Sequence, residues 1–88
     1  MEIGSKVRAL AGKEKDQKFV VVRSEQGFVY LADGDRLKAN KPKKKSLKHV
    51  KREGEKLTLT EGELLEERVN AKIRKFLKRS EHVEGRCN

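Results

Sequence analysis

Residues 6–33, KVRALAGKEKDQKFVVVRSEQGFVYLAD, contain the clearest structural signal in the chain. Small apolar residues occupy every second position over residues 6–12, and β-branched valines dominate residues 18–24, as is typical of strands. A third apolar run, which includes two aromatic residues, covers residues 27–33. Turn-forming glycine and aspartate residues border these runs. The pattern predicts an antiparallel meander of short strands.

A small barrel is the economical way to complete such a meander, because closure removes exposed strand edges. The stretch SLKHVKRE, residues 46–53, is a candidate closing strand. Its apolar members, Leu47 and Val50, lie three residues apart, which does not match the two-residue period of a strand. We predict a mainly β fold, an antiparallel barrel over residues 1–56.

Helical periodicity follows the barrel segment. Thr60 and Glu63 form a potential capping box, in which a hydroxyl and a carboxylate satisfy the first backbone donors of a helix. Apolar residues then recur at helical spacing, namely Leu65, Val69, Ile73, Phe76 and Leu77. Asn70 leaves two alternatives open, one helix broken at that residue or two helices in succession. We expect residues 57–80 to form this helical appendage and residues 81–88 to be a disordered tail.

The charge of the protein is concentrated in one segment. The 88 residues carry a formal net charge of +9. Residues 36–56 hold ten basic and two acidic side chains, a net charge of +8; residues 1–35 hold six of each sign, and residues 57–88 hold seven basic and six acidic. Such a segment is the electrostatic signature of a protein that binds a polyanion, either nucleic acid or an anionic membrane surface.

Cys87 is the only cysteine, so no intramolecular disulfide can form, which fits a reducing compartment. No apolar stretch approaches the about 20 residues that span a bilayer. The N-terminal sequence MEIGSKVRAL, residues 1–10, lacks the long apolar core of a signal peptide. We therefore expect a cytoplasmic protein.

Residues 3–22, IGSKVRALAGKEKDQKFVVV, resemble the KOW motif, which several ribosomal proteins and transcription elongation factors share. In that motif a glycine precedes an alternating strand, and a second glycine, a basic–acidic–basic loop, a further glycine and an apolar strand follow. Gly4, Gly12 and the loop residues 13–15 match these positions. Asp16 stands where the motif has its loop-closing glycine. Because aspartate tolerates a left-handed backbone better than most residues, we expect the turn to form.

The resemblance continues in VYLADGDRLKANKPKKKSLKHV, residues 29–50, and more weakly in AKIRKFLK, residues 71–78. Both segments are similar to those of a family of small bacterial KOW-domain RNA-binding proteins, which are described as similar to archaeal and eukaryotic-type large-subunit ribosomal proteins. The resemblance spans residues 2–52, with support from residues 70–78. It implies an SH3-like β-barrel that binds structured RNA, in particular ribosomal RNA.

The basic run KANKPKKKSLKHVKRE, residues 38–53, is the main candidate for RNA contact. Pro42 favours an extended backbone, which spaces the following lysines as in a strand. Lysine supplies point charges that position phosphates rather than read bases. The predicted contacts are Lys41, Lys43, Lys44, Lys45, Lys48, Lys51 and Arg52, supported by Arg36 and Lys38. The alternative is a solvated loop whose lysines only aid solubility.

A second group of cations belongs to the first predicted hairpin and consists of Arg8, Lys13, Lys15 and Lys18. If the barrel closes, the loop over residues 12–17 lies near the basic run and extends its surface. The alternative is an ordinary charged hairpin loop, because Glu14 and Asp16 offset the lysines locally.

Two aromatic residues, Phe28 and Tyr30, share one face of the third strand, and Val29 and Leu31 share the other. Exposed aromatic rings can stack on unpaired bases. A small barrel also needs large side chains in its core. We therefore expect Phe28 to pack in the core and regard Tyr30 as the candidate for base stacking.

The predicted helix carries basic residues beside its apolar stripe, namely Arg68, Lys72, Arg74, Lys75, Lys78 and Arg79. We expect the helix to be a lid on the barrel, with its basic residues as a secondary RNA contact. His49, His82 and Cys87 match no compact metal-ligand spacing, and no serine–histidine–acid arrangement can be assigned. We expect no metal, no cofactor and no catalysis.

Together these features predict a non-enzymatic RNA-binding protein that is monomeric when free. The resemblance implies ribosomal RNA as the ligand and a role in the large subunit, its assembly or translation. Two other classes remain open. One is a KOW-type protein-interaction module of transcription elongation, and the other is a protein that binds anionic membranes through its C-terminal helix.

Overall fold

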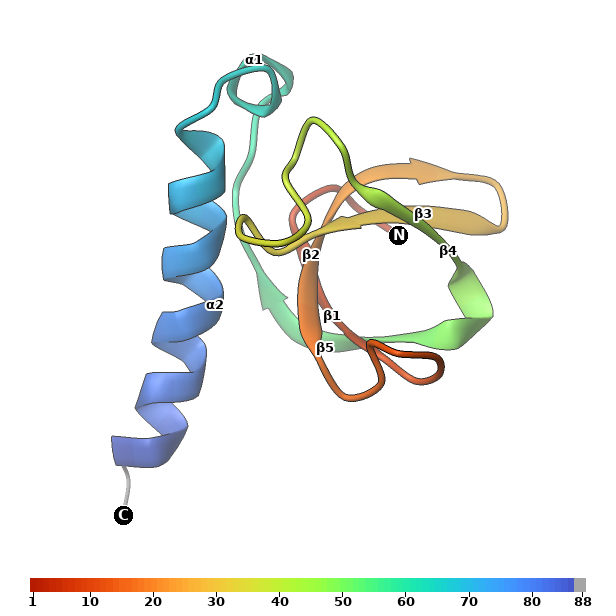
Figure 1. Ribbon diagram of the computed structural model, residues 1–88, viewed down its shortest axis with the longest axis horizontal. Helices are drawn as coiled ribbons and strands as arrows, with labels where there is room; N and C mark the ends of the chain where they lie inside the picture. The colour runs from red at the N-terminus through yellow and green to blue at the C-terminus, as the bar shows by residue number, and fades with distance from the viewer. Residues whose placement is uncertain (87–88) are drawn as a thin grey trace.

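The computed structural model describes residues 1–86, and the side chains of residues 1–78. Strands occupy the N-terminal part of this region and helices the C-terminal part (Figure 1). The strands are β1 (Ser5–Ala9), β2 (Lys18–Glu25), β3 (Phe28–Ala32), β4 (Lys43–Ser46) and β5 (Val50–Lys56). A 3-10 turn, η1 (Leu47–His49), joins β4 to β5, and the helices α1 (Glu61–Leu64) and α2 (Val69–Arg86) follow. The mainly β class, the first three predicted strands and the helical C-terminal part are confirmed.

The five strands of the described region form one antiparallel sheet in the order β4-β3-β2-β1-β5. β1 to β4 pair as a meander, and β5 returns to pair with β1. Register shifts between Val21 and Arg23 and between Ser5 and Val7 bend the sheet. β4 and β5 are its two edges, and within residues 1–86 no ladder joins them. The sheet is therefore open between β4 and β5, where the sequence predicted a closed barrel, and η1 is the connection between these two edge strands.

The basic run is structured throughout, and its organisation differs from the prediction. Lys43–Ser46 form β4, a strand that was not predicted, directly after Pro42. The predicted closing strand over residues 46–53 is wrong in its first half, because residues 47–49 belong to η1. β5 begins at Val50 and continues to Lys56. The turn of η1 accounts for the three-residue spacing of Leu47 and Val50, which no strand could explain.

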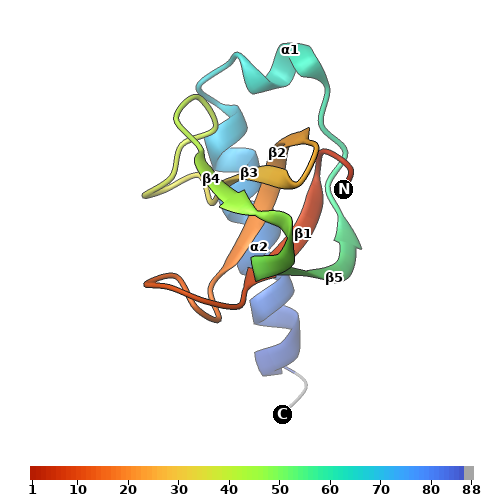
Figure 2. The same cartoon turned by 90° about the vertical axis from the view of Figure 1, so that its right-hand side faces the viewer.

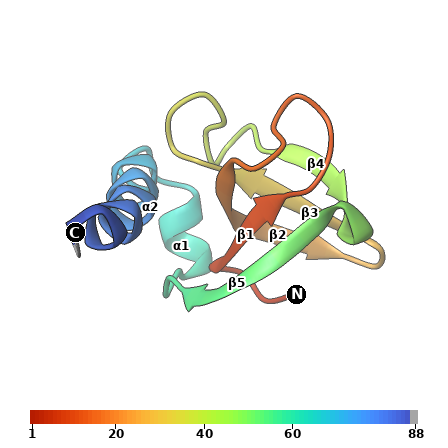
Figure 3. The same ribbon diagram turned by 90° about the horizontal axis from the view of Figure 1, so that it is seen from below.

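The sheet is apolar on both faces, and β2 contributes to both. Phe19 and Val21 belong to a cluster on the inner, concave face, together with Val7, Ala9, Val29, Leu31 and Val50. Val20 and Val22 belong to a second cluster with Ala32, Ala39, Val69, Ile73 and Leu77. The last three come from α2, which packs along the outer face of the sheet (Figures 1 and 3). The unbroken FVVV sequence is therefore explained by burial on both sides.

Two helices in succession form the C-terminal part, which resolves the alternatives left open by the sequence. Thr60 and Glu63 make the predicted capping box at α1. The chain turns before α2, so Asn70 lies in the first turn of α2 and not at the break. Its Oδ1 accepts a 2.8 Å hydrogen bond from the backbone N–H of Ala39, which ties α2 to the β3–β4 loop. Leu65 is 89% exposed, so its assignment to the apolar stripe is wrong.

α2 is helical as far as Arg86. Of the expected tail over residues 81–88, the last two residues lie outside the described region, and so do the side chains of all eight. The disordered tail stays a prediction.

Candidate nucleic-acid interface

Two loops project from the same side of the sheet, the β1–β2 loop (residues 10–17) and the β3–β4 loop (residues 33–42) (Figures 2 and 3). Asp16 adopts a φ of 71°, as expected for the loop-closing position. Lys13, Arg36 and Lys43 come from three separate segments and line one cavity of about 170 Å³. The predicted proximity of the first loop to the basic run is therefore confirmed.

The same two loops and β4 carry further cations. Lys15 and Lys41 are exposed, and Lys38 and Lys45 are partly exposed. We call the set the loop cluster, which consists of Lys13, Lys15, Arg36, Lys38, Lys41, Lys43 and Lys45. Tertiary structure brings Lys13 and Arg36 to one cavity with Lys43, and it brings Lys43 and Lys45 to Glu14.

Glu14 lies inside the loop cluster and pairs with two of its lysines. The Nζ of Lys43 donates to Oε2 of Glu14 at 2.8 Å, and the Nζ of Lys45 lies 3.4 Å from Oε1. Lys45 also donates to the carbonyl oxygen of Ala11 at 2.8 Å. The hydrogen bond from Lys43 lowers the pKa of Glu14, with a further contribution from Lys45. A phosphate that binds Lys43 or Lys45 must therefore compete with a carboxylate of the same chain.

Lys44 points to the opposite face of β4 from Lys43 and Lys45. Its register partner is Tyr30, whereas Lys43 and Lys45 pair with the core residues Leu31 and Val29. The Nζ of Lys44 lies 4.4 Å from the centroid of the Phe28 ring. Lys44 therefore contacts the Phe28 ring, whereas Lys43 and Lys45 contact Glu14.

Of the two candidate aromatic residues, Phe28 is the more exposed, which is the reverse of the prediction. Phe28, expected in the core, is 40% exposed, so this expectation is wrong. Tyr30 is partly buried against the cluster beneath α2, and its hydroxyl donates to Glu25 at 3.1 Å. Arg23 lies over the Tyr30 ring at 5.2 Å from its centroid. α2 covers one end of the outer face and leaves the Phe28 end open, which sequence alternation alone cannot reveal.

The remaining predicted contacts lie on or beside the other edge of the sheet. Lys51 of β5 is the register partner of Arg8, and Arg8 and Lys18 each lie 3.6 Å from a carboxylate oxygen of Glu53. Arg52 is exposed on β5, and Lys48 is exposed in η1. β5 lies on the side of the sheet opposite to the two loops (Figures 2 and 3). The predicted RNA-binding residues are therefore distributed over the loop cluster, the opposite face of β4 that carries Lys44, and the β5 side of the sheet.

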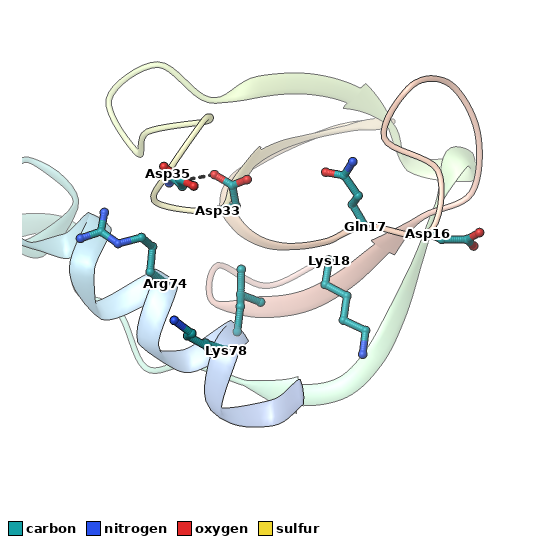
Figure 4. A pocket seen from close by; sticks show the side chains of 8 residues that line it. Asp16, Gln17, Lys18, Asp33, Asp35, Arg74 and Lys78 are labelled. Carbon is teal, nitrogen blue, oxygen red and sulfur yellow. Dashed lines mark hydrogen bonds between the residues drawn. The ribbon is translucent and has the colours of Figure 1, made fainter. Parts of the chain in front are cut away.

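A larger cavity of about 460 Å³ lies where α2 meets the two loops (Figure 4). Arg74 and Lys78 extend from α2 and Lys18 from β2. Three carboxylates, those of Asp16, Asp33 and Asp35, line the same cavity and balance these cations. Arg74 donates a hydrogen bond to the carbonyl of Gly34, which fixes α2 to the β3–β4 loop. The position of α2 over the outer face agrees with the expected lid, and its balanced charges make this cavity a weaker anion site than the loop cluster.

Two cations of the helical segment are already engaged. Lys72 donates to the carboxylate of Glu63 at 2.6 Å and to the carbonyl of Thr58 at 3.0 Å, and Arg68 pairs with Glu66 at 2.7 Å. Arg79 lies outside the described side chains. Arg74, Lys75 and Lys78 are therefore the exposed cations of α2 in the described region.

Within the described part of the chain, no group of three or more histidine, cysteine, aspartate or glutamate residues is arranged to hold a metal ion. The side chains of His82 and Cys87 fall outside that part. None of the helices there has the length and apolar character needed to cross a membrane. No protein-family model matches the chain, and no curated protein matches it significantly.

Proposed function

We propose that this protein is a non-enzymatic RNA-binding module that binds folded RNA mainly through its phosphates. The observation that carries the proposal is the net charge of +8 on residues 36–56, in a chain whose other segments are nearly neutral. Solubility alone does not require such a concentration of charge. Binding to a polyanion does benefit from it, because each cation that neutralises a phosphate releases a counterion and so raises the affinity. The loop cluster supports the proposal, because it joins cations of this segment to those of the β1–β2 loop.

The chemistry of the cluster suits phosphate binding. Lysine predominates over arginine, and an ammonium group is a point charge without the planar fork that recognises guanine. Alternate side chains of an extended strand lie roughly 7 Å apart, so Lys43 and Lys45 can contact different phosphates. We assign the first phosphate contacts to the loop cluster and a second set to Lys48, Lys51 and Arg52.

We further propose that the fold is SH3-like and of the KOW type, with its barrel open between β4 and β5. Three features support this. Gly4 and Gly12, at the motif's glycine positions, have φ values of 94° and 83°, and Asp16 takes the left-handed conformation of the third. β1 to β4 form a meander, β5 returns to β1, and a 3-10 turn links the two edge strands. On this basis the RNA is ribosomal, and the protein acts as a monomer in the cytoplasm on the large subunit, its assembly or translation.

Salt-dependent binding to a structured RNA tests the core of the proposal. Fluorescence anisotropy with a labelled ribosomal RNA fragment, at 50 to 200 mM salt, should show affinity falling by roughly 10³- to 10⁵-fold if six to ten phosphates are neutralised. A nearly flat response would contradict phosphate binding. Crosslinking in cells followed by sequencing tests the ribosomal part. Recovery dominated by messenger or transfer RNA would overturn the ribosomal assignment. Recovery of RNA polymerase without RNA, when the crosslinked proteins are identified, would overturn it as well.

A further inference from the structure

Phe28 is the only exposed aromatic residue among the four in the sequence; Phe19 is buried, and Tyr30 and Phe76 are partly buried. It begins β3 at the hairpin with β2, and its neighbour Val29 points into the core. Phe28 therefore projects from the outer face of the sheet, beyond the end that α2 covers. An aromatic ring held on a strand and left uncovered is available for a planar ligand.

A cation already lies over this ring. Lys44 of the paired strand β4 places its Nζ 4.4 Å from the ring centroid. Ser46, the register partner of Phe28, follows on the same face of β4. Among the residues whose side chains are described, no carboxylate pairs with Lys44, whereas Lys43 and Lys45 both contact Glu14. The middle lysine of the KKK sequence is therefore the one whose charge is not already offset by an acid.

An acid that neighbours Phe28 on this face, Glu25, already has partners. Glu25 is the register partner of Phe28. Its carboxylate pairs with Arg23 at 2.9 Å and accepts the hydroxyl hydrogen of Tyr30 at 3.1 Å. The surface around Phe28 thus combines a solvent-exposed ring, the Lys44 ammonium that lies over it, the Ser46 side chain and a carboxylate that is already paired.

We propose that Phe28 is a stacking platform for one unpaired RNA base and that Lys44 binds an adjoining phosphate of the same strand. This inference rests on the proposed RNA-binding function and specifies the form of RNA that fits. A nucleotide offers the two groups that this surface takes, a planar base for the ring and an anion for the ammonium. Base–aromatic stacking is stronger than an exposed cation–π contact, so a base displaces Lys44 from the ring and releases it for the phosphate.

Because β4 is an edge strand, one RNA can contact both the Phe28 surface and the loop cluster. Alternate residues of β4 face opposite ways, so Lys43 and Lys45 belong to the loop cluster while Lys44 belongs to the Phe28 surface. One RNA strand that crosses this edge can place its phosphates against Lys43 and Lys45 on one side and an unpaired base on Phe28 on the other. The ligand is therefore a folded RNA with an unpaired loop, bulge or end next to its helix.

The test compares a stem–loop RNA with a fully paired RNA duplex of equal phosphate number, by anisotropy at fixed salt. Phe28→Ala should lower affinity for the stem–loop by about five- to a hundredfold, the loss expected for one stacked base. It should leave the salt dependence and the duplex affinity unchanged. Phe28→Tyr should retain binding, and Lys44→Gln should reduce the slope of log affinity against log salt by about 0.7–0.9. Leu65→Ala, at an exposed apolar position on the α1–α2 connection, is the matched control.

A spectroscopic readout reports the stacking directly. The chain contains no tryptophan, so Phe28→Trp introduces a unique fluorophore at the platform. Its emission should be quenched by the stem–loop and not by the duplex. Equal affinity of Phe28→Ala and the unsubstituted protein for the stem–loop, or unquenched emission from the Phe28→Trp variant at saturating stem–loop, would overturn the platform while leaving phosphate binding intact. Absence of any RNA binding by the unsubstituted protein would overturn both proposals.

Discussion

Glu14→Gln is the substitution that most directly probes the loop cluster. Glutamine keeps the size of the side chain and removes the charge that contacts Lys43 at 2.8 Å and Lys45 at 3.4 Å. The net charge of the protein rises from +9 to +10. Two ammonium groups that a carboxylate now engages become available to phosphates. We expect tighter RNA binding, which is the opposite of the usual effect of a substitution in a binding site.

The size of the effect follows from the two contacts that disappear. The pair with Lys43 is exposed and the pair with Lys45 is part-buried. On the scale of exposed ion pairs, each one opposes phosphate binding by a factor of about 1.5 to 5. Two such pairs predict an affinity increase of about two- to thirtyfold. If both lysines gain a phosphate, the slope of log affinity against log salt steepens by about 0.7–0.9 for each.

The assay is anisotropy with a structured RNA over a series of salt concentrations. The matched control is Glu66→Gln, which removes the same charge next to Arg68 on the connection between α1 and α2. An equal gain in both variants would mean that only net charge matters. Unchanged or weaker binding of Glu14→Gln, with the control unchanged, would refute the assignment of Lys43 and Lys45 to the interface.

The same residue predicts a pH dependence of stability. Because Lys43 lowers the pKa of Glu14 in the folded protein, the ionised carboxylate stabilises the fold. This contribution is fully present above the ordinary value of 4.5 and is lost as the pH falls through the lowered folded pKa. The difference in Tm between the unsubstituted protein and Glu14→Gln should therefore shrink on acidification below about pH 4.5. A difference that is constant down to pH 3 would contradict the ion pairs.

Three further substitutions test how α2 is held on the sheet, each by urea or thermal denaturation. Asn70→Ala leaves the buried N–H of Ala39 without its acceptor and should cost about 1–3 kcal/mol. Gly34→Ala should destabilise by more than about 1 kcal/mol, because its φ is +79° and a Cβ would lie 2.1 Å from the carbonyl oxygen of Asn70. Ile73→Ala removes a fully buried side chain and should cost about 2–5 kcal/mol, whereas Leu65→Ala should change stability by less than about 0.5 kcal/mol. Equal effects of these last two would contradict the packing of α2.

Several features of the fold were accessible from local sequence. The β-branched run FVVV predicted β2, because a strand buried on both faces needs no polar alternation. Thr60 and Glu63 predicted the start of α1, since a capping box depends only on residues three positions apart. Asp16 was expected to accept a left-handed backbone and does so. Pro42 indicated an extended backbone for the lysines that follow, and these form β4.

The errors came from contacts between distant residues and from local turns that the sequence patterns did not indicate. Alternation placed Phe28 and Tyr30 on one face of β3, and it did not indicate that α2 covers the Tyr30 end of that face. Helical spacing placed Leu65 on the apolar stripe, although the chain turns between α1 and α2 and exposes it. The continuous basic run suggested one surface, and η1 divides it between opposite edges of the sheet.

The sequence by itself determined the first three strands, the helical C-terminal part and the concentration of positive charge, because periodicity and composition are local properties of the chain. Only the tertiary structure decided which lysines meet. It placed Glu14 against Lys43 and Lys45, 29 and 31 positions away, and it left Lys44 beside an open aromatic ring. Strand register decides which lysines contact Glu14 and which contacts Phe28. Neighbouring residues of β4 face opposite sides of the sheet, and their partners come from other segments of the chain.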